Sequence, residues 1–456
     1  MDSPEVIMAR RYVFWRTSNG SPTKGDNRAK NAPVALLRKI GECGFPNTDG
    51  GVSFSFFLPQ IDWAVSNAVI IIDPDGRELN RHDAAHVVQE AISGVVKDLG
   101  GRKPIPPDAL ILRADKCAVS FFRRPAEDYF LLTTLSVRDL PVARISAFGG
   151  AMVSLAHRRS KYPAPAVVSD SSNPVIDAHL RQSNYRTIKV ITKGRSTYEA
   201  TESALDLVHL LRGLWNIAAT VGGWSLKFGA RRFDPLGVIH TGPFHTLHLP
   251  DGTCSADVVW YDPDYAGDQA LYEPENGWAK IDRFRVFAIR NMKRLDYARE
   301  LQQLVIRYAI ALDHTDLEVA FLMLWGILEN ITGTVGANYD ETIKRATWCF
   351  KDREIARDLL EHMRCYRNQY VHAAKSGGPT QQMAFVLKSF VDEHLLRLIR
   401  NDHRVSSIRE YAEFFSLPTD VATLATRARL LRKAVRFLNS TKSSTGNESL
   451  DAPPKS

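Results

Sequence analysis

The sequence predicts an α+β protein, in which a strand-rich mixed N-terminal region precedes an all-α helical bundle. Short runs of β-branched and aromatic residues, bounded by Pro, Gly and Asp, recur through about the first 260 residues. From residue 281 onward, apolar residues recur at helical spacing almost without a break. A Gly- and acid-rich connector, residues 262–277, separates these two patterns. We therefore predict one region over residues 1–275 and a helical bundle over residues 276–442.

In the N-terminal region, the predicted strands are residues 52–58, 68–72, 109–112, 118–122, 129–135, 185–192 and 258–261. Two predicted helices interrupt them, residues 83–99 and 201–221, and each is followed by paired glycines, where helices commonly end. The Pro-, Ser- and Asn-rich stretch 158–184 is predicted to be a long loop or a joint between subdomains.

The bundle consists of amphipathic segments. We predict helices over residues 281–312 (one helix or two), 317–331, 353–374, 381–400, 408–415 and 420–438. Residues 443–456 have no apolar periodicity and are rich in Ser, Thr, Asn and Pro. We expect that segment to be a disordered tail.

Composition excludes several classes of protein. The hydrophobic fraction of 44% and the charged fraction of 24% are those of an ordinary globular protein. The sequence holds no apolar run of the roughly 18–20 residues that a spanning helix needs, and no signal-peptide pattern, so we expect no membrane partner. The five cysteines are scattered and never spaced CxxC, which favours a reducing, cytoplasmic location. Phosphate-loop and dinucleotide-binding glycine motifs are absent from the sequence.

The most informative motif is Arg-Asn-Gln-Tyr-Val-His, residues 367–372, near the end of a predicted helix. On a helix that advances about 100° per residue, Asn368 and His372 share a face, and Arg364 lies a further turn back on that face. Arg367 lies about 140° from His372, towards the apolar side, from which its long side chain can reach across. The net charge of +8 is compatible with a polyanionic partner.

These residue types suit the cleavage of RNA by its own 2′-hydroxyl. An imidazole with an ordinary pKa near 6.5 can move the protons at neutral pH. A guanidinium grips two phosphoryl oxygens and stays charged, which stabilises the phosphorane. An amide such as that of Asn368 fixes the geometry. The scheme requires no metal and no cofactor.

Residues Arg367 to His372 resemble the R-x4–6-H signature of the HEPN superfamily, in the form in which Asn follows Arg. Residues 317–329, Leu-Glu-Val-Ala-Phe-Leu-Met-Leu-Trp-Gly-Ile-Leu-Glu, are similar to an earlier HEPN helix that often carries an acidic residue at about the position of Glu329. The order of the elements is similar to that of ApeA-type HEPN proteins of bacterial anti-phage defence. The resemblance covers roughly residues 281–438.

This resemblance implies a metal-independent endoribonuclease that leaves a 2′,3′-cyclic phosphate and acts as a homodimer of paired HEPN domains. It implies that Arg367 and His372 are catalytic, that Asn368 supports them, and that Glu329 orients Arg367 or the cleft. It also implies an anti-phage role, with the N-terminal region sensing a trigger ligand or phage protein. The alternatives are a catalytically silent HEPN module that binds RNA, nucleotide or a partner protein, and an unrecognised enzyme in the N-terminal region.

Other candidates have two interpretations each. Basic residues spaced i, i+3, i+4 and i+7 on the last helix either bind RNA phosphates or form a solvated face: Arg429, Arg432, Lys433 and Arg436. Arg364 is either a phosphate ligand or a partner of Glu361. His82, His86 and Glu90 have metal-like spacing but lack a further partner, so we favour a polar face. Among His240, His245 and His248, the last two would point to opposite faces of a strand, which disfavours joint ligation.

Overall fold

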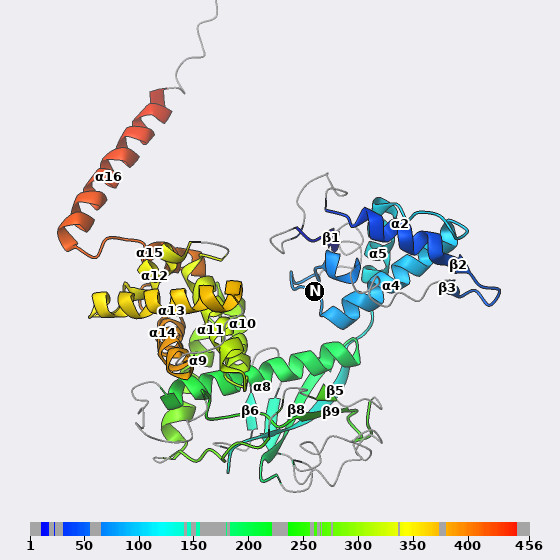
Figure 1. The fold of residues 1–456 in the computed structure, drawn as a ribbon, viewed down its shortest axis with the longest axis horizontal. Coiled ribbons are helices and arrows are strands. Elements are labelled where there is room, and N and C mark those ends of the chain that lie inside the picture. The colour runs from blue at the N-terminus through cyan, green and yellow to red at the C-terminus, as the bar shows by residue number, and fades with distance from the viewer. Residues whose placement is uncertain are drawn as a thin grey trace, which may run out of the picture. The chain divides into compact units, whose positions relative to one another are not determined.

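A computed structural model describes the chain over the following residues: 11–17, 22, 31–54, 65–140, 144–146, 152–155, 179, 183–220, 236–255, 260–261, 265, 267–274, 277–335, 338–373 and 380–444 (Figure 1). The chain forms two compact units, and each is built from two separate stretches. The N-terminal unit is Met1–Val208 with Thr241–Glu273, and the helical unit is His209–His240 with Pro274–Ser456. The helical unit resumes close to the predicted boundary at 275, but it also takes residues 209–240, which the sequence analysis assigns to the N-terminal region.

Among its described residues, the first part of the N-terminal unit combines two small antiparallel strand pairs with three helices. The pairs are β1 (Val13–Trp15) with β4 (Val69–Ile71), and β2 (Gly44–Pro46) with β3 (Val52–Phe54). The helices are α2 (Val34–Cys43), α4 (Arg81–Asp98) and α5 (Pro107–Phe122). Apolar residues between Tyr12 and Phe122 form one buried cluster that joins these elements.

Helix α5 corrects a prediction, because residues 109–112 and 118–122 were expected to be strands. In the structure both belong to one continuous helix. Pro107 lies in the first turn, where its missing N–H removes no intrahelical bond. The buried positions of α5 are three or four residues apart: Leu110, Ala114, Cys117 and Phe121. Each apolar run alone looks like a strand, and only the pattern across both runs indicates a helix.

The second part of the N-terminal unit is a six-stranded antiparallel sheet in the order β10-β9-β5-β8-β7-β6. The central strand β5 (Glu127–Leu135) pairs along its whole length with β8 (Arg186–Gly194) and, on its other edge, with β9 (Phe244–His248), as Figure 1 shows. The outer strands are β6 (Arg144–Ser146), β7 (Met152–Leu155) and β10 (Trp260–Tyr261). Residues 129–135 are buried without alternation, as expected of a strand that is covered on both faces. The predicted α+β class is confirmed. The predicted loop at 158–184 lies almost wholly outside the described residues.

The described elements of the helical unit are all helices. They are the second half of α8 (Thr197–Thr220), α9 (Ala279–Met292), α10 (Ala298–Ala311), α11 (Leu317–Thr332), α12 (Tyr339–Thr347), α13 (Arg353–Ala373), α14 (Thr380–Arg400), α15 (Ile408–Phe414) and α16 (Val421–Ser444). The predicted helix 281–312 is therefore two helices. Helix α11 packs against α10, α12, α14 and α15. Asp316 precedes the helix, and its carboxylate accepts from the amides of Glu318 and Val319. Gly333 follows the helix with a φ of 64°, a left-handed conformation that glycine adopts readily.

A buried ion pair joins the two stretches of the helical unit. The fully buried Arg212 on α8 donates to both carboxylate oxygens of Asp313, at 2.7 and 2.6 Å, and to the Ile239 carbonyl at 3.1 Å. His240 contacts the same carboxylate at 3.1 Å. Burial alone would raise the pKa of Asp313, but the Arg212 charge and the hydrogen bond with His240 outweigh it and hold that pKa well below its usual value. Residues 209–220 and 236–240 are thereby fixed to the helices beyond residue 274.

Helix α16 differs from the other helices in its exposure. Between Val421 and Asn439 every side chain is exposed except that of Leu424, which is half-buried. Apolar side chains are included, for example Leu431 at 66% exposure. Within the described part of the chain, no helix combines the length and the apolar composition that crossing a bilayer requires. The predicted tail overlaps the end of α16, which extends to Ser444, and residues 445–456 lie outside the described part.

Candidate functional site

Helix α13 carries the predicted catalytic motif in its last turns. Its buried residues Leu360, Met363 and Tyr366 recur every three residues and fix the side of the helix that packs inward. Arg367 and Asn368 follow directly and are both half-buried. His372 belongs to the same helix, but its side chain lies outside the described part, as do all side chains from residue 369 to the end of α13.

Arg367 is the best-defined residue of the motif. Its guanidinium carbon lies 5.0 Å from the centre of the Tyr339 ring, within the range of a cation–π contact. Its Nη1 makes a long contact of 3.5 Å with Oδ1 of Asn368. Its Nε is shielded from solvent and has no hydrogen-bond acceptor among the described residues. The group is therefore an oriented, partly desolvated cation whose Nε–H has no acceptor among the described residues.

Glu329 does not contact Arg367 directly. Its Oε1 accepts a hydrogen bond of 2.8 Å from Nε1 of Trp325, one turn earlier on α11. The Trp325 ring packs against the ring of Tyr339 at 6.3 Å, and Tyr339 faces Arg367. No ion pair joins Glu329 to Arg367 among the residues that the structure covers. The described contacts thus connect Glu329 to Arg367 through the rings of Trp325 and Tyr339, and the role of Glu329 in orienting Arg367 or the cleft stays a prediction.

Tyr366 fixes α13 to α11 beside this group. Its ring meets that of Phe321 edge-on at 5.4 Å, and its hydroxyl donates to Oε1 of Glu318 at 3.2 Å. Since Tyr366 directly precedes Arg367, these contacts fix the position of the backbone from which the Arg367 side chain extends. The backbone at the motif is thus anchored by packing and by one polar contact.

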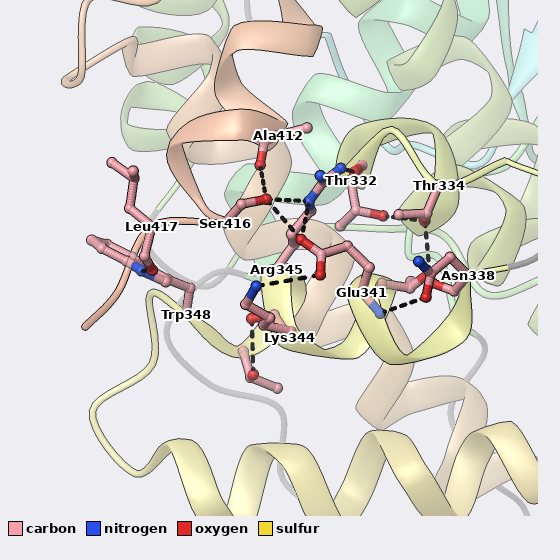
Figure 2. Close-up of polar contacts among 12 residues, drawn as sticks. Thr332, Thr334, Asn338, Glu341, Lys344, Arg345, Trp348, Ala412, Ser416 and Leu417 are labelled. Carbon is pink, nitrogen blue, oxygen red and sulfur yellow. Dashed lines mark hydrogen bonds and ion pairs between the residues drawn. The ribbon is translucent and has the colours of Figure 1, made fainter. Parts of the chain in front are cut away.

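Helix α12, which supplies Tyr339, is held in turn by Arg345. The Arg345 Nε donates to Glu341 at 3.0 Å and to the Ser416 hydroxyl at 2.7 Å, and Nη1 donates to the Thr332 carbonyl at 2.5 Å. Figure 2 shows this guanidinium between the end of α11, its own helix and the residues after α15. At the start of α12, the Asn338 side chain accepts from the Glu341 amide and caps the helix. The position of Tyr339 is therefore fixed from both ends of its helix.

Arg364 forms ion pairs with two carboxylates. Its guanidinium contacts Asp340 at 2.6 Å and Glu361 at 2.8 Å. The interpretation of Arg364 as a partner of Glu361 is confirmed. With both carboxylates in place, Arg364 contributes little positive charge to a phosphate at this site.

The basic residues of α16, Arg429, Arg432, Lys433 and Arg436, are all exposed. Arg432 makes one local contact, from Nε to the Ala428 carbonyl at 3.3 Å. The apolar residues of the same helix are exposed as well, for example Val435 at 57%. The basic stripe is therefore accessible, and none of its residues makes a hydrogen bond or ion pair with Arg367 or Asn368, the motif residues whose side chains the structure describes.

Sequence reasoning missed Tyr339 and Trp325, the two rings that connect Arg367 to Glu329. The helix that starts at Tyr339 was not predicted, although Asn338 followed by Asp340 and Glu341 is a helix-start signal. Trp325 lies within the predicted helix 317–331 but was given no role, and only its indole N–H distinguishes it from a purely apolar core residue.

No protein-family model, curated protein or solved structure matches this chain. Functional assignment therefore depends on the residues and on their geometry.

Proposed function

We propose that this protein is a metal-independent endoribonuclease of the HEPN type, with its catalytic group at the end of α13. The observation that carries the proposal is the state of Arg367. Its guanidinium is held over Tyr339, and its Nε has no acceptor among the described residues, on the helix that also carries His372. A phosphate oxygen is the kind of acceptor that satisfies such a donor.

In the proposed reaction, the ribose 2′-hydroxyl attacks the neighbouring phosphorus and the bond to the 5′-oxygen breaks. His372 accepts the hydroxyl proton, and an imidazolium supplies the proton that the 5′-oxygen needs. Arg367 stabilises the added negative charge on the phosphoryl oxygens, and Asn368 supports its orientation. The products are a 2′,3′-cyclic phosphate and a 5′-hydroxyl. By the HEPN resemblance, two copies in the cytoplasm contribute one Arg367 and one His372 each, and the activity serves anti-phage defence.

The test is cleavage of total RNA by the purified full chain, with analysis of the product ends. We expect Arg367→Ala and His372→Ala each to lower the rate by about 10²–10⁴, the usual contribution of a positioned acid–base or charge-stabilising group. Arg357→Ala and His362→Ala are the matched controls, because both residues are exposed on α13 and lie outside the motif. Since the scheme uses only proton transfer and a fixed cation, EDTA should leave the rate unchanged.

The competing interpretation is a silent module that binds RNA, nucleotide or a partner protein. It predicts no cleavage by the wild type and equal RNA affinity for the wild type and His372→Ala. Cleavage that EDTA abolishes, or that the two control substitutions reduce as much as the motif substitutions, would exclude the histidine mechanism.

A further inference from the structure

The N-terminal unit contains a cavity of about 520 Å³ between the β1–β4 strand pair and the first turns of α4. All of its lining residues belong to that unit. Pockets that hold small organic molecules typically measure roughly 300–1,000 Å³. This cavity therefore has the size of a ligand site, and it is distinct from the residues of α13.

One part of the cavity is apolar. Val69 and Ile71 of β4 contribute to it, and each is at most 3% exposed. Leu79, Ala84 and Ala85 continue the lining onto the start of α4. These side chains can cover the apolar body of a ligand but offer it no hydrogen bond.

The polar part of the lining has an excess of positive charge. Arg16 is fixed in place, because it donates to Glu78 at 2.5 Å and to the Asn67 carbonyl at 3.0 Å. Arg81, the first residue of α4, is exposed and has no ion pair among the described residues. The lining thus contains two guanidinium groups and one carboxylate. Asp83, in the first turn of α4, offsets the partial positive charge of the helix start, but it accepts hydrogen bonds from Asn80 and Ser196 and is not among the lining residues. This balance favours an anion, and guanidinium groups bind carboxylates and phosphates in particular.

Two further features indicate where a ligand would be held. The side-chain nitrogen of Asn67 is shielded from solvent and makes no hydrogen bond to any described residue, which leaves a donor for a ligand oxygen. At the start of α4, the ring of His82 stacks on that of Tyr198 at 4.4 Å with only 8° between their planes. Of the two rings only that of His82 belongs to a lining residue, so Tyr198 holds in place an aromatic ring that borders the cavity beside Arg81.

We infer that this cavity binds a small organic anion that combines a phosphate or carboxylate group with a flat, largely apolar body. The anionic group lies at Arg81 and the start of α4, and the body lies against Val69, Ile71 and Leu79. The inference goes beyond the proposed ribonuclease activity, and it survives if that activity is absent.

Calorimetric titration of the full chain with AMP, benzoate and adenosine tests this inference. AMP supplies a phosphate, benzoate supplies a carboxylate, and adenosine is the uncharged analogue of AMP. We expect AMP or benzoate to bind with a dissociation constant below about 1 mM, and adenosine to bind at least about 10-fold more weakly than AMP. The stronger of the two anions identifies the anionic group.

Two variants locate the binding. Arg81→Ala removes the exposed cation and should weaken binding about 10-fold or more, whereas Arg123→Ala removes an exposed arginine at the end of α5 and should have no effect. Ala85→Trp fills the cavity without changing the charge and should abolish binding, with circular dichroism as the check on folding. The inference is overturned if neither anion binds, or if Arg81→Ala and a folded Ala85→Trp both bind like the wild type. Binding that Arg367→Ala abolishes and Ala85→Trp preserves would assign the ligand to α13 instead.

Discussion

Arg345 on α12 and Arg367 on α13 belong to the same helical unit but have opposite surroundings. Arg345 donates to a carboxylate, a hydroxyl and a backbone carbonyl, which together tie three segments of the unit (Figure 2). Arg367 lies over an aromatic ring and keeps an Nε–H with no described acceptor. A saturated guanidinium has little left for a substrate, whereas an unsaturated one gains by binding an anion. Arg345 therefore maintains the fold, whereas Arg367 is the arginine that we propose binds the phosphate.

The largest expected effect is on stability, and it is measured by comparing substitutions of the two arginines. Arg345→Ala leaves the Glu341 carboxylate and the Thr332 carbonyl without their donor, so we expect the free energy of unfolding to fall by about 3–4 kcal/mol. Arg367→Ala removes the cation–π contact with Tyr339 but no described ion pair, so we expect a smaller loss of about 1–2 kcal/mol. Urea titration of both variants measures the two values. Equal losses for the two variants would remove the distinction.

A second prediction concerns His394, which supports the region around Arg345. It is fully buried, its Nε2 donates to the Ala346 carbonyl at 2.9 Å, and its Nδ1 accepts from the Tyr411 hydroxyl at 2.9 Å. Burial penalises the charged ring and lowers the pKa of His394 to about 4. In the unfolded chain the pKa of His394 has its ordinary value near 6.5. Between pH 6.5 and pH 4 the unfolded chain therefore binds a proton at His394, whereas the folded chain does not.

Stability of the helical unit should consequently be fully present above about pH 6.5 and should fall by about 3 kcal/mol as the pH drops to 4. Unfolding by urea across this pH range measures the slope. His394→Gln should flatten the slope, because an amide does not titrate, while the matched control His362→Gln, on the exposed face of α13, should retain it. An identical slope in both variants would show that other groups are responsible.

The smallest expected effect concerns Tyr339 and tests whether the ring positions Arg367. Tyr339→Leu removes the cation–π contact, which contributes about 1–2 kcal/mol when it is partly desolvated. We expect kcat for RNA cleavage to fall about 5–30-fold with KM little changed, since the lost contact orients a group that acts in the transition state. Tyr339→Phe keeps the ring and should retain near wild-type kcat. A loss that is the same in both variants would mean that the hydroxyl, not the ring, matters.

The sequence was most informative where one period extends over many residues. The helices that start at Leu317, Arg353 and Ile408 were predicted almost to their observed ends, because apolar residues at helical spacing leave no competing interpretation. The prediction failed for α5, where two short apolar runs lie on either side of polar residues. The discontinuous composition of the two units has no local signal, because it depends on contacts between residues far apart in the sequence, such as Arg212 and Asp313.

For the candidate site, the sequence predicted which residues to examine but not what surrounds them. The motif placed Arg367 towards the apolar side of its helix, and the structure places it over Tyr339. Nothing in the spacing indicates that ring, because Tyr339 lies on a different helix. Likewise, the resemblance assigns Glu329 an orienting role, but its actual partner is the Trp325 indole. Contacts between elements follow from packing, which a single sequence does not encode locally.

The ion pair between Arg212 and Asp313 bears on how the chain is made. The ribosome releases residues 209–240 before it has translated Asp313, and at roughly 5–20 residues per second that interval lasts several seconds. Strands β9 and β10 are translated during this interval, so all strands of the N-terminal sheet are present before Asp313. Until Asp313 is translated, Arg212 has no carboxylate to pair with. A nascent chain that terminates within this window lacks the helices beyond residue 274, so the apolar residues of α8 that are buried in the finished protein, such as Leu214 and Trp215, remain exposed and prone to aggregate.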